Sequence, residues 1–273
     1  MKIEEKETMK RMLTVLLALV LTMTGLACAE TLRVGMECNY APFNWTQADE
    51  SADAIPLAGG GYADGYDVRI AKRVAEYLGY DLEIVKTEWD GLIMSVMSGA
   101  IDCIIAGMSP TEERMLTIDF TDPYYESDLV IVVKKDGAYA GATSLEDFAG
   151  ATIVGQLNTF HDTVIDQIPD VKHATPMDTF PTMIVAVSSG SVDGYVSERP
   201  GAESAVATNP DLTYVVFEDG KGFEADPSDT TIAVGVKKDS ELTAKINEAL
   251  ATISEEERVQ IMGDALAAQP SAQ

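Results

Sequence analysis

The chain has 273 residues, 46% of them hydrophobic and 23% charged, a composition that excludes disordered and fibrous proteins and is typical of globular ones. This length is enough for two modest domains or one large domain. The formal net charge of −26 argues against a nucleic-acid partner, because an acidic surface repels phosphates, but it keeps a protein soluble and is compatible with a cationic ligand.

The first residues carry a signal for export. The basic pair Lys10-Arg11 precedes an apolar stretch at 13–23, and the small residues Ala27-Cys28-Ala29 follow at the positions that a signal peptidase reads. The apolar stretch is too short to span a bilayer comfortably. We therefore expect residues 1–29 to be a signal peptide cleaved after Ala29, which predicts a periplasmic or extracellular cell-surface protein. A lipid anchor on Cys28 is the alternative.

Strand and helix patterns alternate from residue 31 onward, which predicts an α/β fold with parallel sheets and crossover helices. The expected strands lie at 31–35, 81–85, 102–106, 130–133, 152–156, 192–196, 213–216 and 231–236. The expected helices lie at 68–78 and near 92–97, 159–167, 178–188, 200–207, 241–252 and 255–266. Residues 38–64, which are rich in Gly, Ala and Asp, are expected to form a long loop.

The segment from Ser109 to Glu112 predicts a helix start directly after the strand at 102–106. Ser109 and Glu112 have the spacing of a capping box, and Pro110 suits the first helical position. Ligands of open α/β sheets bind at the carboxyl ends of strands, and helix N-termini attract anions. Arg114 could therefore grip a carboxylate with two parallel hydrogen bonds. An ion pair between Arg114 and a neighbouring acid is an equally good interpretation of the spacing alone.

The cysteines and histidines of the mature chain predict neither a disulfide nor a metal site. Cys38 and Cys103 are expected at opposite ends of parallel strands, too far apart to bridge, so we predict free, buried thiols. These two residues share no metal-ligand spacing with His161 and His173. The sequence contains no nucleophile elbow, and the absence of a phosphate-binding loop argues against an ATPase. We expect no cofactor.

Six short segments occur in a fixed order: Tyr40-Ala41-Pro42-Phe43, Gly65-Tyr66-Asp67-Val68, Trp89-Asp90-Gly91-Leu92-Ile93, Ala106-Gly107-Met108-Ser109, Thr111-Glu112-Glu113-Arg114 and Asp119-Phe120-Thr121-Asp122-Pro123-Tyr124. Together they resemble the polar amino-acid-binding proteins of ABC importers, the family 3 extracellular solute-binding proteins. The resemblance covers nearly all of the mature chain. It implies a periplasmic-binding-protein-like type II fold, with two α/β lobes joined by a two-strand hinge. Lobe 1 would combine residues 30–126 and 219–273, and lobe 2 would hold 127–218.

The resemblance also implies a function and partners. The protein would close by hinge motion around a free amino acid and deliver it to the permease subunits of an ABC transporter, as a monomer that is peripheral at the outer face of the membrane. It would not be an enzyme. The alternatives are a cyclohexadienyl dehydratase-like enzyme on the same fold, for which Glu37 would be the candidate general acid, and the sensing lobe of a receptor.

Five ligand-binding residues follow from the same motifs. The Gly107 carbonyl and the Ser109 hydroxyl match the family's partners for the ligand α-ammonium, and Arg114 matches the arginine that binds the α-carboxylate. Thr159 matches a residue that caps the carboxylate from lobe 2. Glu198 matches the acid that receives the α-ammonium, although it replaces a more common Asp and reaches one methylene further.

Three further residues are expected around the ligand side chain. Tyr40 and Trp89 match positions that flank it, and Glu37 matches a nearby acidic position. Two aromatic faces and a carboxylate suit a cationic group, so we favour Arg, Lys, ornithine or His, with a neutral polar amino acid such as Gln as the alternative. Core packing is the alternative role for the two aromatic residues, and a surface position for Glu37. We expect His161 at the surface, with a ligand contact near Thr159 as its alternative.

Overall fold

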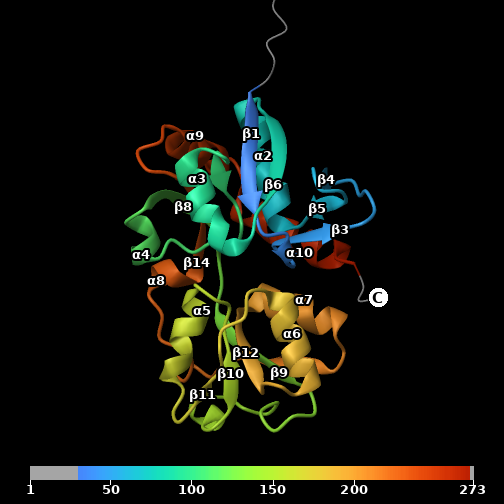
Figure 1. Cartoon of the computed structure of the whole chain (residues 1–273), viewed down its shortest axis with the longest axis vertical. Coiled ribbons are helices and arrows are strands. Elements are labelled where there is room, and N and C mark those ends of the chain that lie inside the picture. Colours follow the sequence, from blue (N-terminus) through green and yellow to red (C-terminus); the bar gives the residue numbers. More distant parts are fainter. Residues whose placement is uncertain (1–29, 271–273) are drawn as a thin grey trace, which may run out of the picture. The chain divides into compact units, whose positions relative to one another are not determined.

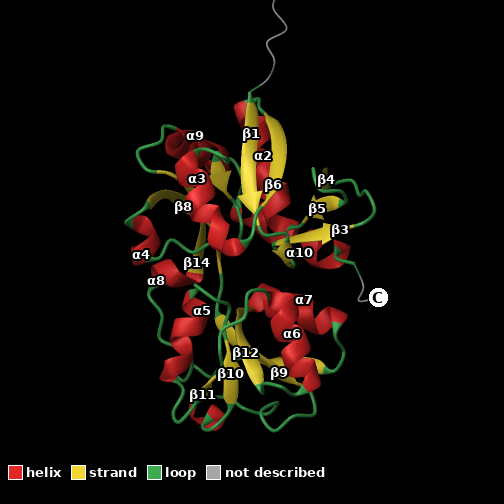
Figure 2. Ribbon diagram, in the orientation of Figure 1, coloured by secondary structure: helices red, strands yellow, loops and turns green. Residues whose placement is uncertain are grey.

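The computed structural model describes residues 30–270, and Figures 1 and 2 trace the chain through them. Within this part, two larger sheets of five strands each, with helices packed around them, form two lobes. The predicted two-lobe α/β fold is therefore confirmed. Both sheets contain the predicted parallel pairs and also antiparallel pairs, which the prediction of parallel sheets did not include. The predicted signal peptide and Cys28 lie outside the described residues.

The sheet of the first lobe has the strand order β6-β1-β7-β14-β8. Its strands are β1 (Thr31–Met36), β6 (Asp81–Lys86), β7 (Cys103–Ile104), β8 (Ile118–Glu126) and β14 (Thr231–Lys237). The central strand β1 pairs in parallel with β6 and β7, whereas β14 runs antiparallel to β7 and β8. The helices next to these strands in the chain are α2 (Tyr66–Leu78), α3 (Leu92–Ser98), α4 (Glu112–Met115), α8 (Pro227–Thr230), α9 (Leu242–Ala251) and α10 (Glu255–Ala268).

The sheet of the second lobe has the order β11-β10-β12-β9-β13. Its strands are β9 (Leu129–Lys134), β10 (Thr152–Val154), β11 (Lys172–His173), β12 (Gly194–Glu198) and β13 (Leu212–Val215), and its helices are α5 (Phe160–Thr163), α6 (Phe180–Ser189) and α7 (Arg199–Thr208). The chain passes from one sheet to the other twice, between β8 and β9 and between β13 and β14. The residue boundaries of the lobes stay a prediction.

The structure corrects the prediction of a long loop at 38–64. It holds four short strands, β2 (Asn39–Tyr40), β3 (Asn44–Gln47), β4 (Ile55–Pro56) and β5 (Tyr62–Asp64), which form an antiparallel sheet in the order β2-β3-β5-β4. Each strand has only two to four residues, too few for a period-two pattern to emerge from the surrounding Gly, Ala and Asp.

Strand β8 was not among the predicted strands, and its sequence contains Pro123, which has no backbone N–H to donate. The structure places β8 at the edge of its sheet, and the pairing with β14 shifts register beside this proline. An edge position and an irregular register are the two places where a strand tolerates proline.

Helix α4 begins later than the predicted capping box. Its N-cap is Thr111, whose Oγ1 accepts a hydrogen bond from the backbone N–H of Arg114 at 3.4 Å. Thr111 is itself a good N-cap, and it takes the role expected of Ser109. The Ser109 side chain is therefore not used as a cap. Because α4 has only four residues, its dipole is weak, and the charge near this turn comes from Arg114 itself.

Cys38 and Cys103 are buried and free within the described residues, as predicted. Burial raises the pKa of both thiols, that of Cys38 to about 12, so they are unreactive core residues. No helix between residues 30 and 270 is long and apolar enough to cross a bilayer.

Candidate functional site

The two lobes meet around a small cavity of about 10 Å³. The residues that line this inter-lobe cavity are Tyr40, Trp89, Gly107, Ser109, Arg114, Gln156, Thr159, Phe160 and His161. Six of the eight residues predicted for the site are among them. Each of the other two, Glu37 and Glu198, contacts a residue of this lining. The structure thus brings the predicted residues together, while their binding of a ligand stays a prediction.

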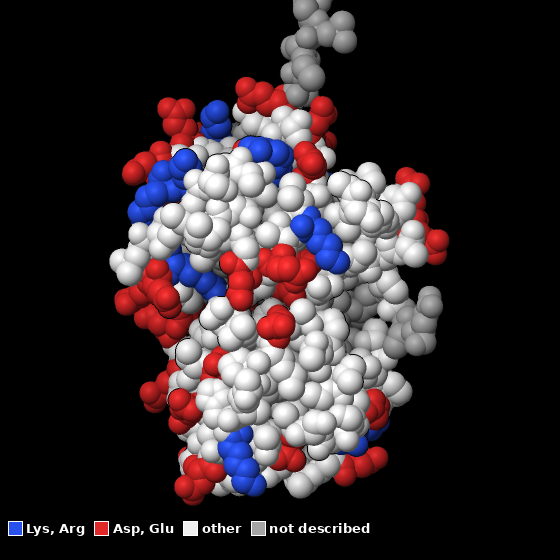
Figure 3. Space-filling model, viewed as in Figure 1, with Lys and Arg blue, Asp and Glu red and all other residues white. Residues whose placement is uncertain are grey.

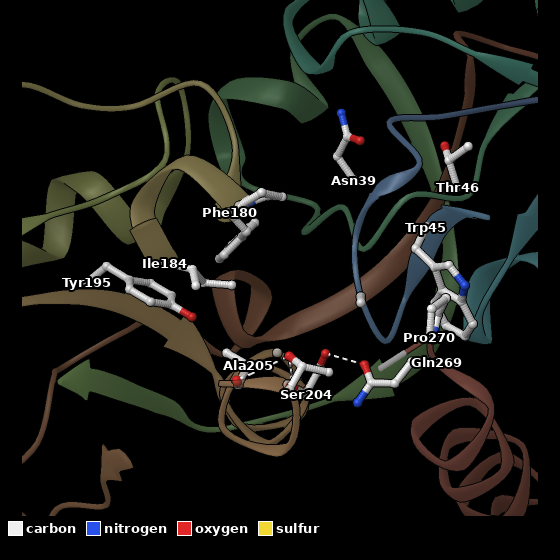
Figure 4. Close-up of a pocket in the computed structure, with 14 residues that line it drawn as sticks. Asn39, Trp45, Thr46, Phe180, Ile184, Tyr195, Ser204, Ala205, Gln269 and Pro270 are labelled. Carbon is white, nitrogen blue, oxygen red and sulfur yellow. Dashed lines mark hydrogen bonds between the residues drawn. The ribbon is translucent and has the colours of Figure 1, made fainter. Parts of the chain in front are cut away.

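A larger cavity, of about 240 Å³, lies between β2, β3, α6, α7 and the C-terminal end of α10 (Figure 4). Every residue that lines it is uncharged, and Ser204 donates a hydrogen bond to Gln269 across it at 2.5 Å. A charged ligand needs charged partners when it is buried. The inter-lobe cavity, which contains Arg114, is therefore the better candidate site.

Arg114 has only neutral hydrogen-bond acceptors. Its Nη1 donates to the Ser109 carbonyl at 2.9 Å, and its Nη2 donates to the Asn158 carbonyl of the second lobe at 3.2 Å. Its guanidinium lies 5.1 Å from the centre of the Trp89 ring. No carboxylate of residues 30–270 forms an ion pair with it, and Asp119 pairs instead with Lys238. Arg114 is half-buried, and loss of solvation lowers its pKa to about 10, although the charges of Glu113 and Asp229 act in the opposite direction.

One buried acid holds two loops of the first lobe in place. Asp67 accepts a hydrogen bond from the Tyr124 hydroxyl at 2.7 Å, and that hydroxyl accepts one from the backbone N–H of Gly107 at 3.3 Å. The other oxygen of Asp67 accepts from Asn44, whose side-chain oxygen accepts from the backbone N–H of Cys38. The loop that contains Gly107 and the loop next to Glu37 are therefore fixed from behind by the same network.

Glu198 lies at the end of β12 and is 2% exposed. Its Oε2 accepts a hydrogen bond from the Tyr40 hydroxyl of the first lobe, and its Oε1 lies 3.1 Å from Nε2 of His161. Burial raises the pKa of Glu198 to about 8. Tyr40 also stacks on Phe180 at a centroid distance of 4.0 Å, so it packs in the core and lines the cavity at the same time.

Glu37 follows β1 and is only 3% exposed, so its predicted surface alternative is wrong. Its Oε2 accepts a hydrogen bond from Gln156 of the second lobe at 3.1 Å, and its Oε1 has no partner in the part of the chain that the structure describes. Burial raises the pKa of Glu37 to about 7. Thr159, 7% exposed, donates its hydroxyl hydrogen to the Gln156 carbonyl at 2.7 Å.

Two polar residues of this site were missed or misplaced by sequence reasoning. Gln156 lies two residues after the end of β10, and its place near the end of a strand was the signal available. His161 is 4% exposed and lines the cavity, so the expected surface position is wrong. Within residues 30–270, no group of three or more His, Cys, Asp or Glu residues is placed to hold a metal ion.

Acidic side chains are prominent on the face that Figure 3 shows, where several of them gather between the two lobes. This distribution agrees with the formal net charge of −26. A negative potential around a cleft raises the local concentration of cations, so the surface favours the approach of a positively charged ligand.

Comparisons with known proteins point to one family. The model of the bacterial extracellular solute-binding proteins, family 3, matches residues 32–263. The arginine-binding extracellular protein ArtP of Bacillus subtilis (strain 168) is 30% identical over 254 residues, which cover 89% of this chain and 92% of that protein.

Solved structures of amino-acid-binding proteins have a similar fold. The amino acid ABC transporter substrate-binding protein AbpA from Streptococcus pneumoniae, bound to L-arginine, has a TM-score of 0.71 and 27% identity and covers 87% of this chain and 94% of its own. An ancestral arginine-binding protein bound to glutamine has a TM-score of 0.69 and 32% identity, and the match covers 86% of this chain and 96% of that protein. The predicted type II fold of periplasmic binding proteins is thereby confirmed.

Proposed function

The chain belongs to family 3 of the bacterial extracellular solute-binding proteins, and from this membership we propose that it binds one free cationic amino acid between its lobes. After export through the signal at residues 1–29, it would work in the periplasm or at the cell surface and deliver this ligand to the permease subunits of an ABC importer. It would act as a monomer and as a binding protein rather than an enzyme. The arginine-binding relative and the arginine-bound neighbour support the choice of ligand class.

The observation that carries the proposal is the balance of charges around the inter-lobe cavity. Arg114 has no acidic partner among the described residues, and Glu37 and Glu198 have no basic partner other than the neutral His161. Buried charges are stable only when they are paired. A ligand with one carboxylate and two positive groups would pair with Arg114 and with both acids. Arginine, lysine and ornithine have these groups.

The proposed contacts follow from this pairing. Arg114 and Thr159 would hold the α-carboxylate, since the guanidinium already reaches the backbone beside Thr159. The Gly107 carbonyl, the Ser109 hydroxyl and Glu198 would hold the α-ammonium.

At the other end of the ligand, Glu37 would pair with the side-chain cation, and Tyr40 and Trp89 would flank it. Residues 30–126 with 219–273 and residues 127–218 would move as two bodies, with the two chain crossings near 125–128 and 217–220 as the hinge.

A neutral polar amino acid such as glutamine is the second candidate. Glu37 already accepts a hydrogen bond from the amide of Gln156, so an amide of the ligand would suit the same carboxyl group. The ancestral arginine-binding protein bound to glutamine also supports this candidate.

A thermal-shift screen of the twenty amino acids tests the proposal, because a ligand that binds only the folded protein raises its melting temperature. We expect arginine, lysine or ornithine to give the largest increase and glutamine a smaller one. The proposal would be overturned if no amino acid raised the melting temperature while a sugar or a dicarboxylate did. Incubation with arogenate or prephenate tests the enzyme alternative, for which we expect no aromatic product.

A further inference from the structure

His161 is a buried polar residue for which the proposed function has no role. It lies in the first turn of α5, next to Thr159, and it lines the inter-lobe cavity. Its side chain is 5% exposed, and within residues 30–270 neither ring nitrogen forms a hydrogen bond, although Nε2 lies 3.1 Å from Oε1 of Glu198. Buried ring nitrogens are normally satisfied, so the missing partner points to a group that the ligand supplies.

The surroundings of the ring keep it neutral and fix its position. On its own helix, Phe160 packs against it at 4.4 Å between ring centres, and Phe180 of α6 contacts it edge-on at 6.0 Å. The charged groups that face it are Glu198 of β12, at 3.1 Å, and Arg114 of the first lobe. Burial, followed by the positive charge of Arg114, lowers the pKa of His161 to about 3. A neutral imidazole has one donor nitrogen and one acceptor nitrogen.

We propose that His161 determines specificity at this site by completing, with Glu198, a subsite for the α-ammonium group of the ligand. Nε2, which lies 3.1 Å from Oε1 of Glu198, would donate to that oxygen in the liganded protein and hold the carboxylate in place. The other accepts an N–H from the ligand. This inference rests on the proposed function, because the α-ammonium is placed at Glu198 there. It adds a neutral acceptor that a ligand without an amino group cannot satisfy.

The experiment compares two ligands and three proteins by calorimetry. The ligands are L-arginine and 5-guanidinopentanoate, which keeps the carboxylate and the guanidinium but lacks the α-ammonium. The proteins are the wild type, His161→Phe, which preserves a ring between Phe160 and Phe180, and His161→Gln, which restores a polar side chain. We expect His161→Phe to weaken arginine binding at least tenfold and to change the Kd of 5-guanidinopentanoate by less than twofold. His161→Gln should lie between the wild type and His161→Phe.

The outcomes separate this inference from the proposed function. Equal weakening of both ligands would show a merely structural role for His161, and an unchanged Kd for arginine would show no role at all. Either result overturns the inference and leaves the proposed function intact. A wild-type protein that binds no amino acid would overturn both. His161→Leu serves as a second apolar variant, so that a folding defect of His161→Phe does not decide the result.

Discussion

The two walls of the inter-lobe cavity hold their polar groups in different ways. In the first lobe, the Gly107 loop is fixed from behind by Tyr124 and Asp67, and Arg114 is oriented by the Ser109 carbonyl. These contacts lie within one lobe. In the second lobe, the side chains of Gln156, Asn158 and Glu198 form hydrogen bonds with side chains of the first lobe. Each of those side chains has a partner in the opposite lobe, although Gln156 also donates to the Asp178 carbonyl of its own lobe.

This difference assigns separate tasks to the two walls. A wall whose groups are already oriented loses little conformational entropy when a ligand docks, so the first lobe provides the docking surface. The second lobe contributes contacts that form on closure, and such contacts mainly slow ligand release. Variants of the first wall should therefore weaken docking itself, whereas variants of the second should mainly raise the dissociation rate.

The largest effect is expected from the first wall, with Arg114→Ala. The ligand carboxylate would lose its cationic partner while buried, which costs about 2–5 kcal/mol of binding free energy. Calorimetry with arginine measures the loss. Arg73→Ala is the matched control, because Arg73 is half-exposed and pairs with Glu257 on the surface. An Arg114→Ala protein that binds as tightly as Arg73→Ala would remove Arg114 from the site.

A smaller effect, confined to the ligand side chain, is expected from Glu37→Gln. The variant keeps the shape of the side chain but removes the charge that would pair with a guanidinium, so we expect arginine to lose about 1.5–3 kcal/mol of binding free energy. Glutamine should lose much less binding free energy, so the difference in affinity between arginine and glutamine should become smaller or change sign. Glu88→Gln, at an exposed acid nearby, is the control. An unchanged ranking would contradict the assignment of Glu37.

The pH dependence of stability tests both acids at once. Burial raises the pKa of Glu37 to about 7 and that of Glu198 to about 8, from 4.5 in each case. The folded protein therefore holds protons that the unfolded chain has released, and its stability without a ligand should fall as the pH rises from 6.5 to 8. His161, with a lowered pKa, has the opposite effect below pH 6.5, so the measurement starts there.

Arginine favours the ionised form of both acids and should offset this loss. The increase in melting temperature that arginine causes is thus expected to grow from pH 6.5 to pH 8. A double variant, Glu37→Gln with Glu198→Gln, should show a flatter dependence in the absence of a ligand. If the stability of the wild type changed with pH as little as that of the double variant, the pKa of neither acid would be raised in the folded protein.

The sequence was a good guide to local structure and to single positions but a poor guide to what the lobes bury between them. The alternation of patterns from Thr31 predicted most elements, because hydrophobic periodicity is a local property. It did not reveal that β14 is antiparallel, since strand direction depends on how the chain crosses between the lobes. For the same reason His161 was expected at the surface. The helix that contains His161 has only four residues, too few to show a hydrophobic pattern. The burial of His161 depends on tertiary contacts, such as the one with Phe180 of α6.

The smallest effect is expected at the rim of the cavity, where Asn158 donates a hydrogen bond to Asp90 of the first lobe at 2.8 Å. Asn158 has a φ of 58°, a left-handed conformation that glycine adopts freely, so Asn158→Gly removes the side chain without straining the turn. A single exposed hydrogen bond contributes about 0.5–1.5 kcal/mol. Because the contact exists only across the two walls, we expect a two- to tenfold faster dissociation of arginine and an almost unchanged association rate.

A double-mutant cycle with Asp90→Ala isolates this contact. If the bond acts as proposed, Asp90→Ala accelerates dissociation to a similar extent, and the double variant is no faster than either single variant. Additive effects would mean that the two side chains act independently. A slower association rate in Asn158→Gly would place Asn158 in the docking step, because its carbonyl also accepts a hydrogen bond from Arg114. The division of tasks between the walls would then fail at Asn158, whose side chain and backbone both reach the first lobe.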